Sequence, residues 1–169
     1  MVPVVVALGS NVGDSLTYLR EAGEALHGIL TAFKFSPIYR TVPMYVEDQA
    51  AYLNAAVSGR TTLGPLALLG RLKELEVQIG RQIRSRFGPR EIDLDLVYYG
   101  SLVYVGPRLQ VPHPKTSERR FVLMPASDVV PDLVLPGVGT ISTLLSQTED
   151  QAQDVVPITD ALFPVPSKR

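Results

Sequence analysis

Cysteine and tryptophan are both absent from this chain of 169 residues. The absence of cysteine excludes a disulfide framework, a thiolate metal site and a cysteine nucleophile. No apolar run approaches the roughly 20 residues of a membrane helix, and the start at residues 1–8 lacks the basic region of a secretory signal. We therefore expect a cytoplasmic protein without membrane contact. The length suits one compact domain that needs no metal or disulfide to fold.

A large net charge is also absent, but the total of −1 hides an uneven distribution. Residues 1–60 carry −1, residues 61–120 carry +4 and residues 121–169 carry −4. Twelve of the sixteen basic side chains are arginine, whose planar guanidinium pairs well with phosphate and carboxylate. The total argues against a strongly basic nucleic-acid binder. The middle third predicts an anionic ligand; the alternative is a solvated loop that is rich in arginine.

The spacing of apolar residues predicts four strands and two helices. The expected strands are residues 2–8, 33–39, 52–58 and 92–99. Apolar residues recur at helical spacing over residues 16–30 and 65–79, and Gly80 is a helix end. Two successive strand–helix–strand units are typical of the ferredoxin-like split βαβ pattern. The fold class that we expect is therefore α+β, ferredoxin-like, with one antiparallel sheet and both helices packed on one face.

Shorter elements are expected in the second half of the chain. Residues 102–105 can pair with strand 92–99 through the Gly100-Ser101 turn. Residues 119–126 and 141–145 predict two short helices. We expect residues 1–145 to form the domain and residues 146–169, which are acidic and then punctuated by proline, to form a loosely attached C-terminal tail.

The sharpest feature is a pair of aspartates, Asp93 and Asp95, within an apolar strand. Side chains alternate across a strand, so both carboxylates share one face while Leu94 and Leu96 point into the core. Aspartate is rare in strands, and two on one face repel each other unless a cation lies between them. Mg²⁺ suits such a pair, because it takes one or two carboxylates together with phosphates and water. The alternative is an exposed sheet face with two solvated aspartates.

Arginines precede this pair at positions 81, 84, 86 and 90. Arginine beside a metal-type aspartate pair indicates a polyphosphate ligand. Neither the P-loop sequence nor the protein-kinase signatures are present. His113 lies near Arg119 in the sequence and can donate to a phosphate, although a single histidine is more often structural. Tyr52, Asn54 and Phe121 are ordinary residues singly, but two aromatics with an amide suit a flat, hydrogen-bonding heterocycle.

The segment Arg86-Phe-Gly-Pro-Arg-Glu-Ile-Asp-Leu-Asp-Leu-Val97 resembles the signature of the 6-hydroxymethyl-7,8-dihydropterin pyrophosphokinase family of folate biosynthesis. The resemblance covers about residues 2–145. Its other matches are Ala7-Leu-Gly-Ser-Asn11, Tyr39-Arg-Thr41, Tyr52-Leu-Asn-Ala-Ala56, Glu76 with Gly80-Arg81, and Val111-Pro-His113 through Arg119 and Phe121. It implies a ferredoxin-like fold and transfer of the pyrophosphoryl group of ATP to the hydroxymethyl group of the pterin, with release of AMP.

The resemblance also implies a role for individual residues. Asp93 and Asp95 are expected to hold two Mg²⁺ ions, and with Arg81 and Arg90 they form the expected catalytic set. ATP is expected to contact Glu76, Arg81, Arg90, Arg108, His113 and Arg119. The pterin is expected to contact Thr41, Tyr52, Asn54, Phe87 and Phe121. Phe87 stands where the family usually has tryptophan.

ATP and the pterin are the expected partners, without nucleic acid or membrane, and we expect a monomer. The competing hypothesis is a ferredoxin-like RNA-binding module whose arginine loop lies on a phosphate backbone. Such modules usually present paired aromatics on the central strands, where this chain has Asp93 and Asp95. A catalytically silent relative of the pyrophosphokinases is the third possibility.

Overall fold

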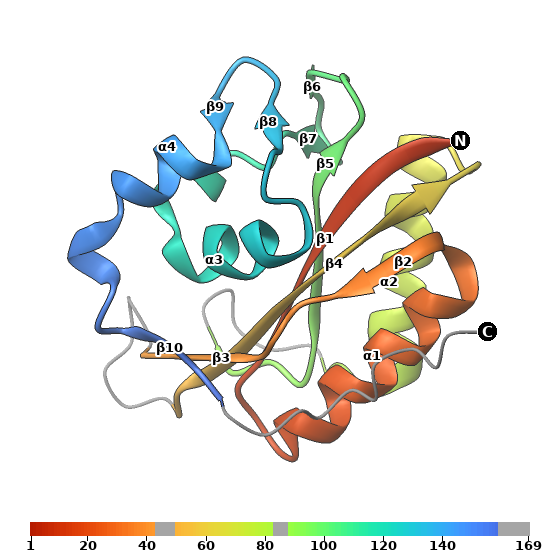
Figure 1. The fold of residues 1–169 in the computed structure, drawn as a ribbon. Coiled ribbons are helices and arrows are strands. Elements are labelled where there is room, and N and C mark those ends of the chain that lie inside the picture. Colours follow the sequence, from red (N-terminus) through yellow and green to blue (C-terminus); the bar gives the residue numbers. More distant parts are fainter. Residues whose placement is uncertain (43–49, 83–87, 159–169) are drawn as a thin grey trace.

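The computed structural model describes residues 1–42, 50–82 and 88–158. Its main feature is a six-stranded antiparallel sheet with helices on both faces (Figure 1). The strands of this sheet are β1 (Val2–Ser10), β2 (Thr31–Phe35), β3 (Tyr39–Thr41), β4 (Tyr52–Thr61), β5 (Asp93–Tyr99) and β10 (Val155–Pro157). Four of them follow the order β5-β1-β4-β2. That order, with α1 (Ser15–Ile29) after β1 and α2 (Pro65–Ile79) after β4, confirms the ferredoxin-like α+β prediction.

The two long helices pack on one face of the sheet, as the sequence predicted. Val4, Val6 and Leu8 of β1 share a buried cluster with residues of both helices, Leu19 and Leu72 among them. The ends of these helices follow from local chemistry. The Asp14 carboxylate accepts the backbone N–H of Thr17 at 3.2 Å, and α2 starts with Pro65 and ends at Gly80, whose φ of 127° favours glycine.

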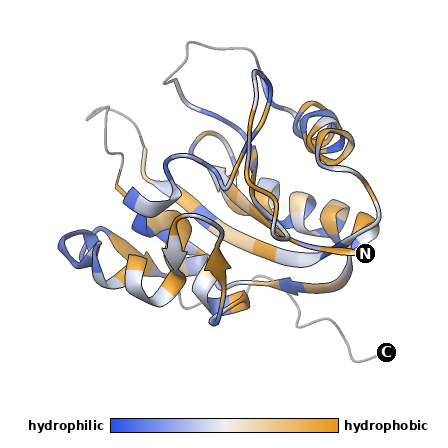
Figure 2. Cartoon of the chain, turned by 90° about the horizontal axis from the view of Figure 1, so that it is seen from above, coloured by the Kyte–Doolittle hydropathy of each residue, from blue (hydrophilic) through white to orange (hydrophobic). Residues whose placement is uncertain are grey.

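The other face of the sheet is covered by a smaller helical layer that the sequence did not place. Helix α3 (Arg120–Val129) and helix α4 (Ile141–Ser146) contribute to a second buried cluster with residues of β1, β4 and β5. Both helices lie across the sheet from α1 and α2 (Figure 1). All of these helices carry hydrophobic and hydrophilic residues together, as expected of helices with one side on a sheet (Figure 2).

The predicted pairing of residues 102–105 with strand 92–99 is wrong. Strand β6 (Tyr104–Val105) pairs instead with β7 (Gln110–Val111), and a separate hairpin joins β8 (Val134–Leu135) to β9 (Gly139–Thr140). The chain turns away after Gly100, whose φ is 53°. The C=O of Val97 in β5 accepts the backbone N–H of His113 at 3.1 Å, so a more distant segment occupies this side of the strand.

Beyond α4 the chain runs back to the sheet. The 3₁₀ turn η2 (Glu149–Gln151) follows α4, and β10 then pairs antiparallel with β3. A second 3₁₀ turn, η1 (Thr116–Glu118), precedes α3. Val155 of β10 is buried. The division into a domain and a tail at residue 146 stays a prediction. No helix in the described ranges is long and apolar enough to cross a membrane.

Candidate active site

Strand register brings the predicted site residues together at one end of the sheet. Gly9 of β1 is the direct partner of Asn54 in β4 on one side and of Asp93 in β5 on the other. Two residues before Gly9 on β1, Ala7 is the direct partner of Asp95 in β5. Directly paired residues point to the same face. Asn54, Asp93 and Asp95 therefore project from the face that carries α3, away from α1 and α2.

Gly9, which has no side chain, lies between Asn54 and Asp93. A Cβ built at Gly9 lies 3.1 Å from Oδ1 of Asn54 and 3.8 Å from Cδ1 of Tyr52. Because glycine has no Cβ, the Asn54 amide can approach β1 closely at this position. The site thus has two adjoining halves. We call Thr41, Tyr52 and Asn54 the neutral half, and Lys73, Glu76, Arg81, Arg90, Asp93 and Asp95 the charged half.

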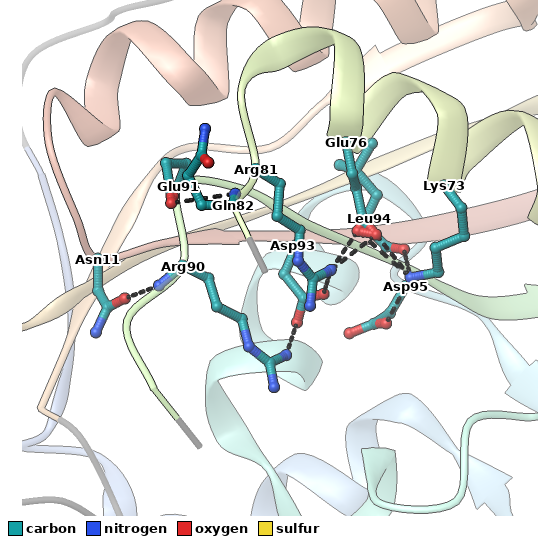
Figure 3. A network of polar contacts seen from close by, with 10 residues as sticks. All are labelled: Asn11, Lys73, Glu76, Arg81, Gln82, Arg90, Glu91, Asp93, Leu94 and Asp95. Atoms are coloured by element: carbon teal, nitrogen blue, oxygen red, sulfur yellow. Dashed lines mark hydrogen bonds and ion pairs between the residues drawn. The ribbon is translucent and has the colours of Figure 1, made fainter. Parts of the chain in front are cut away.

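Arg81 joins the carboxylates of the charged half (Figure 3). Its Nη1 lies 2.6 Å from Oε2 of Glu76 and 3.1 Å from Oδ1 of Asp93. Arg90 binds the other oxygen of Asp93, with its Nη1 2.9 Å from Oδ2. Glu76 is 1% exposed, and a buried carboxylate needs such partners because desolvation strongly disfavours an unpaired charge. The structure therefore brings together four residues to which the resemblance assigned a role in binding or catalysis: Glu76, Arg81, Arg90 and Asp93.

Lys73 is a member of the charged half that the sequence analysis missed. Its Nζ lies 2.8 Å from Oε1 of Glu76, 3.2 Å from the backbone O of Leu94 and 3.9 Å from Oδ1 of Asp95. One signal was available, because Lys73 stands three residues before Glu76 on a helix, where side chains meet on one face. Its approach to β5 was not available, since that depends on how α2 packs.

Asp95 has the most perturbed carboxyl group of the site. Burial raises its pKa to about 7, the nearby charge of Asp93 acts in the same direction, and the Lys73 ammonium opposes the shift. Two carboxylates on one strand face thus repel each other, as the alternation of residues predicted. The Asp95 side chain remains 37% exposed, so an incoming cation can reach it.

The chemistry of this donor set fits Mg²⁺. In the described ranges, no group of three or more His, Cys, Asp or Glu side chains converges as a closed metal site. Asp93 and Asp95 supply two carboxylates on one face, and Mg²⁺ characteristically takes one or two carboxylates and completes its shell with water and phosphate oxygens. Burial and the charge of Asp93 raise the pKa of Asp95, so a cation bound beside it would stabilise the charged carboxylate.

Asn11 fastens the loop after β1 to the segment that leads into β5. Its Oδ1 accepts the backbone N–H of Arg90 at 2.8 Å, and its own backbone N–H donates to the C=O of Arg90 at 3.0 Å. Glu91, which is 4% exposed, accepts the backbone N–H of Gln82 at 3.4 Å. These contacts position Arg90 and Arg81 beside Asp93. The sequence analysis assigned no role to Glu91, which appeared there only within the quoted segment 86–97.

The neutral half is held by a buried hydrogen bond. Nδ2 of Asn54 donates to Oγ1 of Thr41 at 2.8 Å, and both residues are at most 5% exposed. Tyr52 pairs with Thr41 across β3 and β4. Burial raises the pKa of Tyr52, and the charges of Arg90 and Asp93 also act on it, which places its hydroxyl within the field of the charged half. Phe87, Arg84 and Arg86 lie outside the described residues.

The remaining candidates come from the α3 side. The guanidinium carbon of Arg119 lies 5.6 Å from the centre of the Phe121 ring, within cation–π range. Burial and the charge of Arg119 lower the pKa of His113, while the Asp93 carboxylate opposes that shift. Arg108 is exposed between β6 and β7 and, in the described ranges, makes no hydrogen bond or ion pair with the charged half. Among the ring contacts of the described residues, none joins Tyr52 to Phe121, and their predicted sandwich stays a prediction.

Fold and site together define a class: a ferredoxin-like α+β domain that carries a cluster of ion-paired side chains beside a buried, neutral hydrogen bond. Residues 5–131 match the model of the 7,8-dihydro-6-hydroxymethylpterin-pyrophosphokinase (HPPK) family. The chain belongs to this family, which confirms the resemblance drawn from the sequence. Family membership also favours an enzyme over the RNA-binding alternative.

Similar curated proteins are named as pyrophosphokinases or as folate synthesis proteins. The chain is 44% identical over 126 residues to the 2-amino-4-hydroxy-6-hydroxymethyldihydropteridine pyrophosphokinase of Bacillus subtilis. This alignment covers 73% of this chain and 75% of that protein. The Haemophilus influenzae protein of that name is 34% identical over 152 residues, covering 89% and 95% of the two chains. A mitochondrial folate synthesis bifunctional protein of Arabidopsis thaliana is 43% identical over 128 residues, which are 75% of this chain and 23% of that protein.

Solved structures share the fold. The crystal structure of wild-type Plasmodium falciparum HPPK-DHPS aligns with a TM-score of 0.71 at 15% identity, and the alignment covers 90% of this chain and 45% of that one. The chain thus spans less than half of this solved structure and less than a quarter of the plant bifunctional protein, but most of the two bacterial relatives.

Proposed function

We propose that this chain transfers the pyrophosphoryl group of ATP to the hydroxymethyl group of 6-hydroxymethyl-7,8-dihydropterin and releases AMP. One observation carries the proposal beyond family membership. The row Asn54–Gly9–Asp93 places a hydrogen-bonding amide, suited to the edge of a heterocycle, next to a cluster suited to a polyphosphate. The two substrates of such a transfer must lie side by side in this way, because their reacting atoms have to meet.

In the neutral half, Asn54 and Thr41 orient the pterin. The amide of Asn54 is already fixed by its bond to Thr41, so it meets a ring edge without losing much side-chain freedom. Tyr52 and Phe121 provide aromatic faces for the ring, and Phe87, which lies outside the described residues, is a further expected contact. This arrangement holds the hydroxymethyl oxygen toward Gly9 and the charged half.

In the charged half, Arg81 and Arg90 neutralise the phosphates and hold ATP in place. Glu76 holds Arg81, and His113, Arg119 and Arg108 are expected to contact the nucleotide from the α3 side. Asp93 and Asp95 are the residues that would hold Mg²⁺, two ions being expected. When bound, Mg²⁺ supplies positive charge that lowers the repulsion between the phosphate oxygens and the entering hydroxyl oxygen.

The transfer itself is an in-line displacement. The hydroxymethyl oxygen forms a bond to the β-phosphorus, the bond between that phosphorus and the oxygen bridging to the α-phosphate breaks, and the hydroxyl proton is released. AMP leaves with the bridging oxygen. Positioning and charge neutralisation dominate this chemistry, which agrees with a site built from arginines, carboxylates and an amide. A monomeric state and a cytoplasmic location remain predictions.

The decisive experiment is product analysis with purified protein, ATP, Mg²⁺ and the hydroxymethyl pterin. We expect AMP and the pterin diphosphate in equal amounts, with no AMP when the pterin or Mg²⁺ is omitted. Formation of ADP, or ATP turnover that does not depend on the pterin, would contradict the proposal. Salt-sensitive binding of single-stranded RNA in EDTA, without turnover, would favour the RNA-binding alternative.

A further inference from the structure

Lys73 contacts several groups of the charged half, although the proposed function gives it no role. It lies on α2 one turn before Glu76. Its Nζ contacts the Glu76 carboxylate and the backbone O of Leu94 in β5, and it faces the Asp95 carboxylate (Figure 3). Its side chain is 46% exposed. A single ammonium therefore connects two carboxylates that come from two different elements.

The carboxylates of the charged half do not share their cations equally. Asp93 has a guanidinium on each oxygen, at 3.1 Å from Arg81 and 2.9 Å from Arg90. Glu76 is shared by Arg81 and Lys73. Asp95, in contrast, forms an ion pair with one cation of the described residues, Lys73, at 3.9 Å, which is beyond hydrogen-bonding distance. Since Arg81 and Arg90 pair with the two oxygens of Asp93, Lys73 is the cation of the described residues that forms an ion pair with Asp95.

We propose that Lys73 is the resident counter-cation of Asp95, and that it competes with a divalent cation for this carboxylate. The inference rests on the proposed function, in which Asp93 and Asp95 hold the divalent ion. The ammonium stabilises the metal-free site because it offsets the repulsion between Asp95, Asp93 and Glu76. The same charge weakens metal affinity, because a cation entering beside Asp95 is repelled by Lys73.

These two consequences have opposite signs, which separates the proposal from a structural role. Removal of the ammonium lowers the stability of the metal-free protein and tightens divalent-cation binding. A side chain needed for packing alone would lower stability without tightening metal binding. Lys73→Met keeps the aliphatic stem and removes the charge, whereas Lys73→Arg keeps a charge near the same place.

The helix offers a matched control. Arg71 and Glu74 form an exposed ion pair at 3.2 Å with the same spacing of three residues, away from the aspartates. Arg71→Met therefore removes a positive charge and an ion pair from the same helix without touching Asp95. Such an exposed pair contributes little to stability.

The test combines two measurements on purified protein freed of metal. Binding of Mn²⁺, used alone as a probe for divalent cations, is followed by electron paramagnetic resonance of the free ion. Thermal unfolding is followed in EDTA and again with excess Mg²⁺. We expect K73M to lower the Mn²⁺ dissociation constant roughly three- to tenfold, given one charge near a partly exposed site, and to lower the melting temperature in EDTA by about 2–5 °C. K73R and R71M should stay near the wild type in both measurements.

Unchanged or weaker Mn²⁺ binding by K73M overturns the inference, as does equal tightening in R71M. If K73M retains pterin-dependent AMP formation while its Mn²⁺ affinity is unchanged, the inference fails and the proposed function stands. If the wild type binds no Mn²⁺ and forms no AMP, both fail together.

Discussion

The two halves of the site lie at one end of one sheet, yet different forces hold them. The neutral half depends on a buried hydrogen bond of 2.8 Å between two short side chains of neighbouring strands. The charged half depends on ion pairs in which long lysine and arginine side chains, from α2 and from the segment before β5, meet the carboxylates of Glu76 and Asp93. Short side chains on paired strands have little freedom, whereas lysine and arginine have several rotatable bonds and can change partners.

This difference indicates what each half can recognise. A fixed amide and hydroxyl select a ligand by the pattern of donors and acceptors on its edge, because a mismatched ligand leaves a buried polar group unpaired. A cluster of charges on side chains with several rotatable bonds instead neutralises the charge of an incoming ligand. Its internal ion pairs are replaced by ion pairs with that ligand. The following predictions, from the largest expected effect to the smallest, test whether the halves are separate in this sense.

Removal of the Asp95 carboxylate should have the largest effect, and it should be confined to the charged half. We expect Asp95→Ala to reduce AMP formation by about a thousandfold or more, since a metal-held charge contributes several kcal/mol to such a transfer. The metal-free protein should remain folded, because the change relieves repulsion with Asp93. Initial rates and thermal unfolding measure the two effects, with Asp132→Ala on the exposed surface as control. Near-normal turnover would contradict the metal role.

A methyl group at Gly9 should separate the two halves. The added Cβ lies 3.1 Å from Oδ1 of Asn54, which is tighter than ordinary contact, so the amide has to move. We expect Gly9→Ala to weaken pterin binding about tenfold, or about 1.4 kcal/mol, while ATP affinity changes little. Calorimetric titration with each substrate separates these outcomes.

Gly70 supplies the control for that substitution. It lies in α2, where an added Cβ would meet no atom of another element within 4 Å. Gly70→Ala should therefore leave both affinities unchanged and stabilise the helix by about 1 kcal/mol. Equal losses of ATP and pterin affinity in Gly9→Ala would show that the halves are not separate.

Loss of the Thr41 hydroxyl should affect the neutral half alone. Thr41→Val leaves the buried amide of Asn54 without its acceptor, and an unsatisfied buried donor costs about 1–3 kcal/mol. We expect that loss in the free energy of unfolding from urea titrations, together with a severalfold higher KM for the pterin and an unchanged KM for ATP. Thr41→Ser, which keeps the hydroxyl, should recover most of both. A higher KM for ATP in Thr41→Val would show that the neutral half and the charged half do not act separately.

The smallest effect concerns pH and His113. Burial and the charge of Arg119 lower the pKa of His113 below its usual 6.5 in the folded protein. As pH falls from 7, the unfolded chain therefore takes up the proton first, and stability from this residue is lost between its unfolded and folded pKa values. The free energy of unfolding of His113→Gln should fall less steeply than that of the wild type from pH 7 to pH 5. Parallel slopes in urea titrations would show that His113 does not contribute.

Prediction from the sequence succeeded where the signal was local. The shared face of Asp93 and Asp95 follows from the alternation of a strand, and the ends of α2 follow from Pro65 and Gly80. It failed for residues 102–105, because the segment that hydrogen-bonds to β5, at His113, lies further along the chain, where no local spacing indicates the contact. Lys73 also escaped, since its partner Asp95 lies on another element and no periodicity connects them.

By itself, the sequence determined the two successive strand–helix–strand units, the aspartate pair on one face and membership of the pyrophosphokinase family, because each follows from local spacing or from a contiguous motif. Tertiary structure alone decided that Gly9 lies between Asn54 and Asp93, that Lys73 reaches Asp95, and that α3 covers the face opposite α1 and α2. Those relations arise from cross-strand register and helix packing, which join residues far apart in the chain and depend on how the whole core fits together.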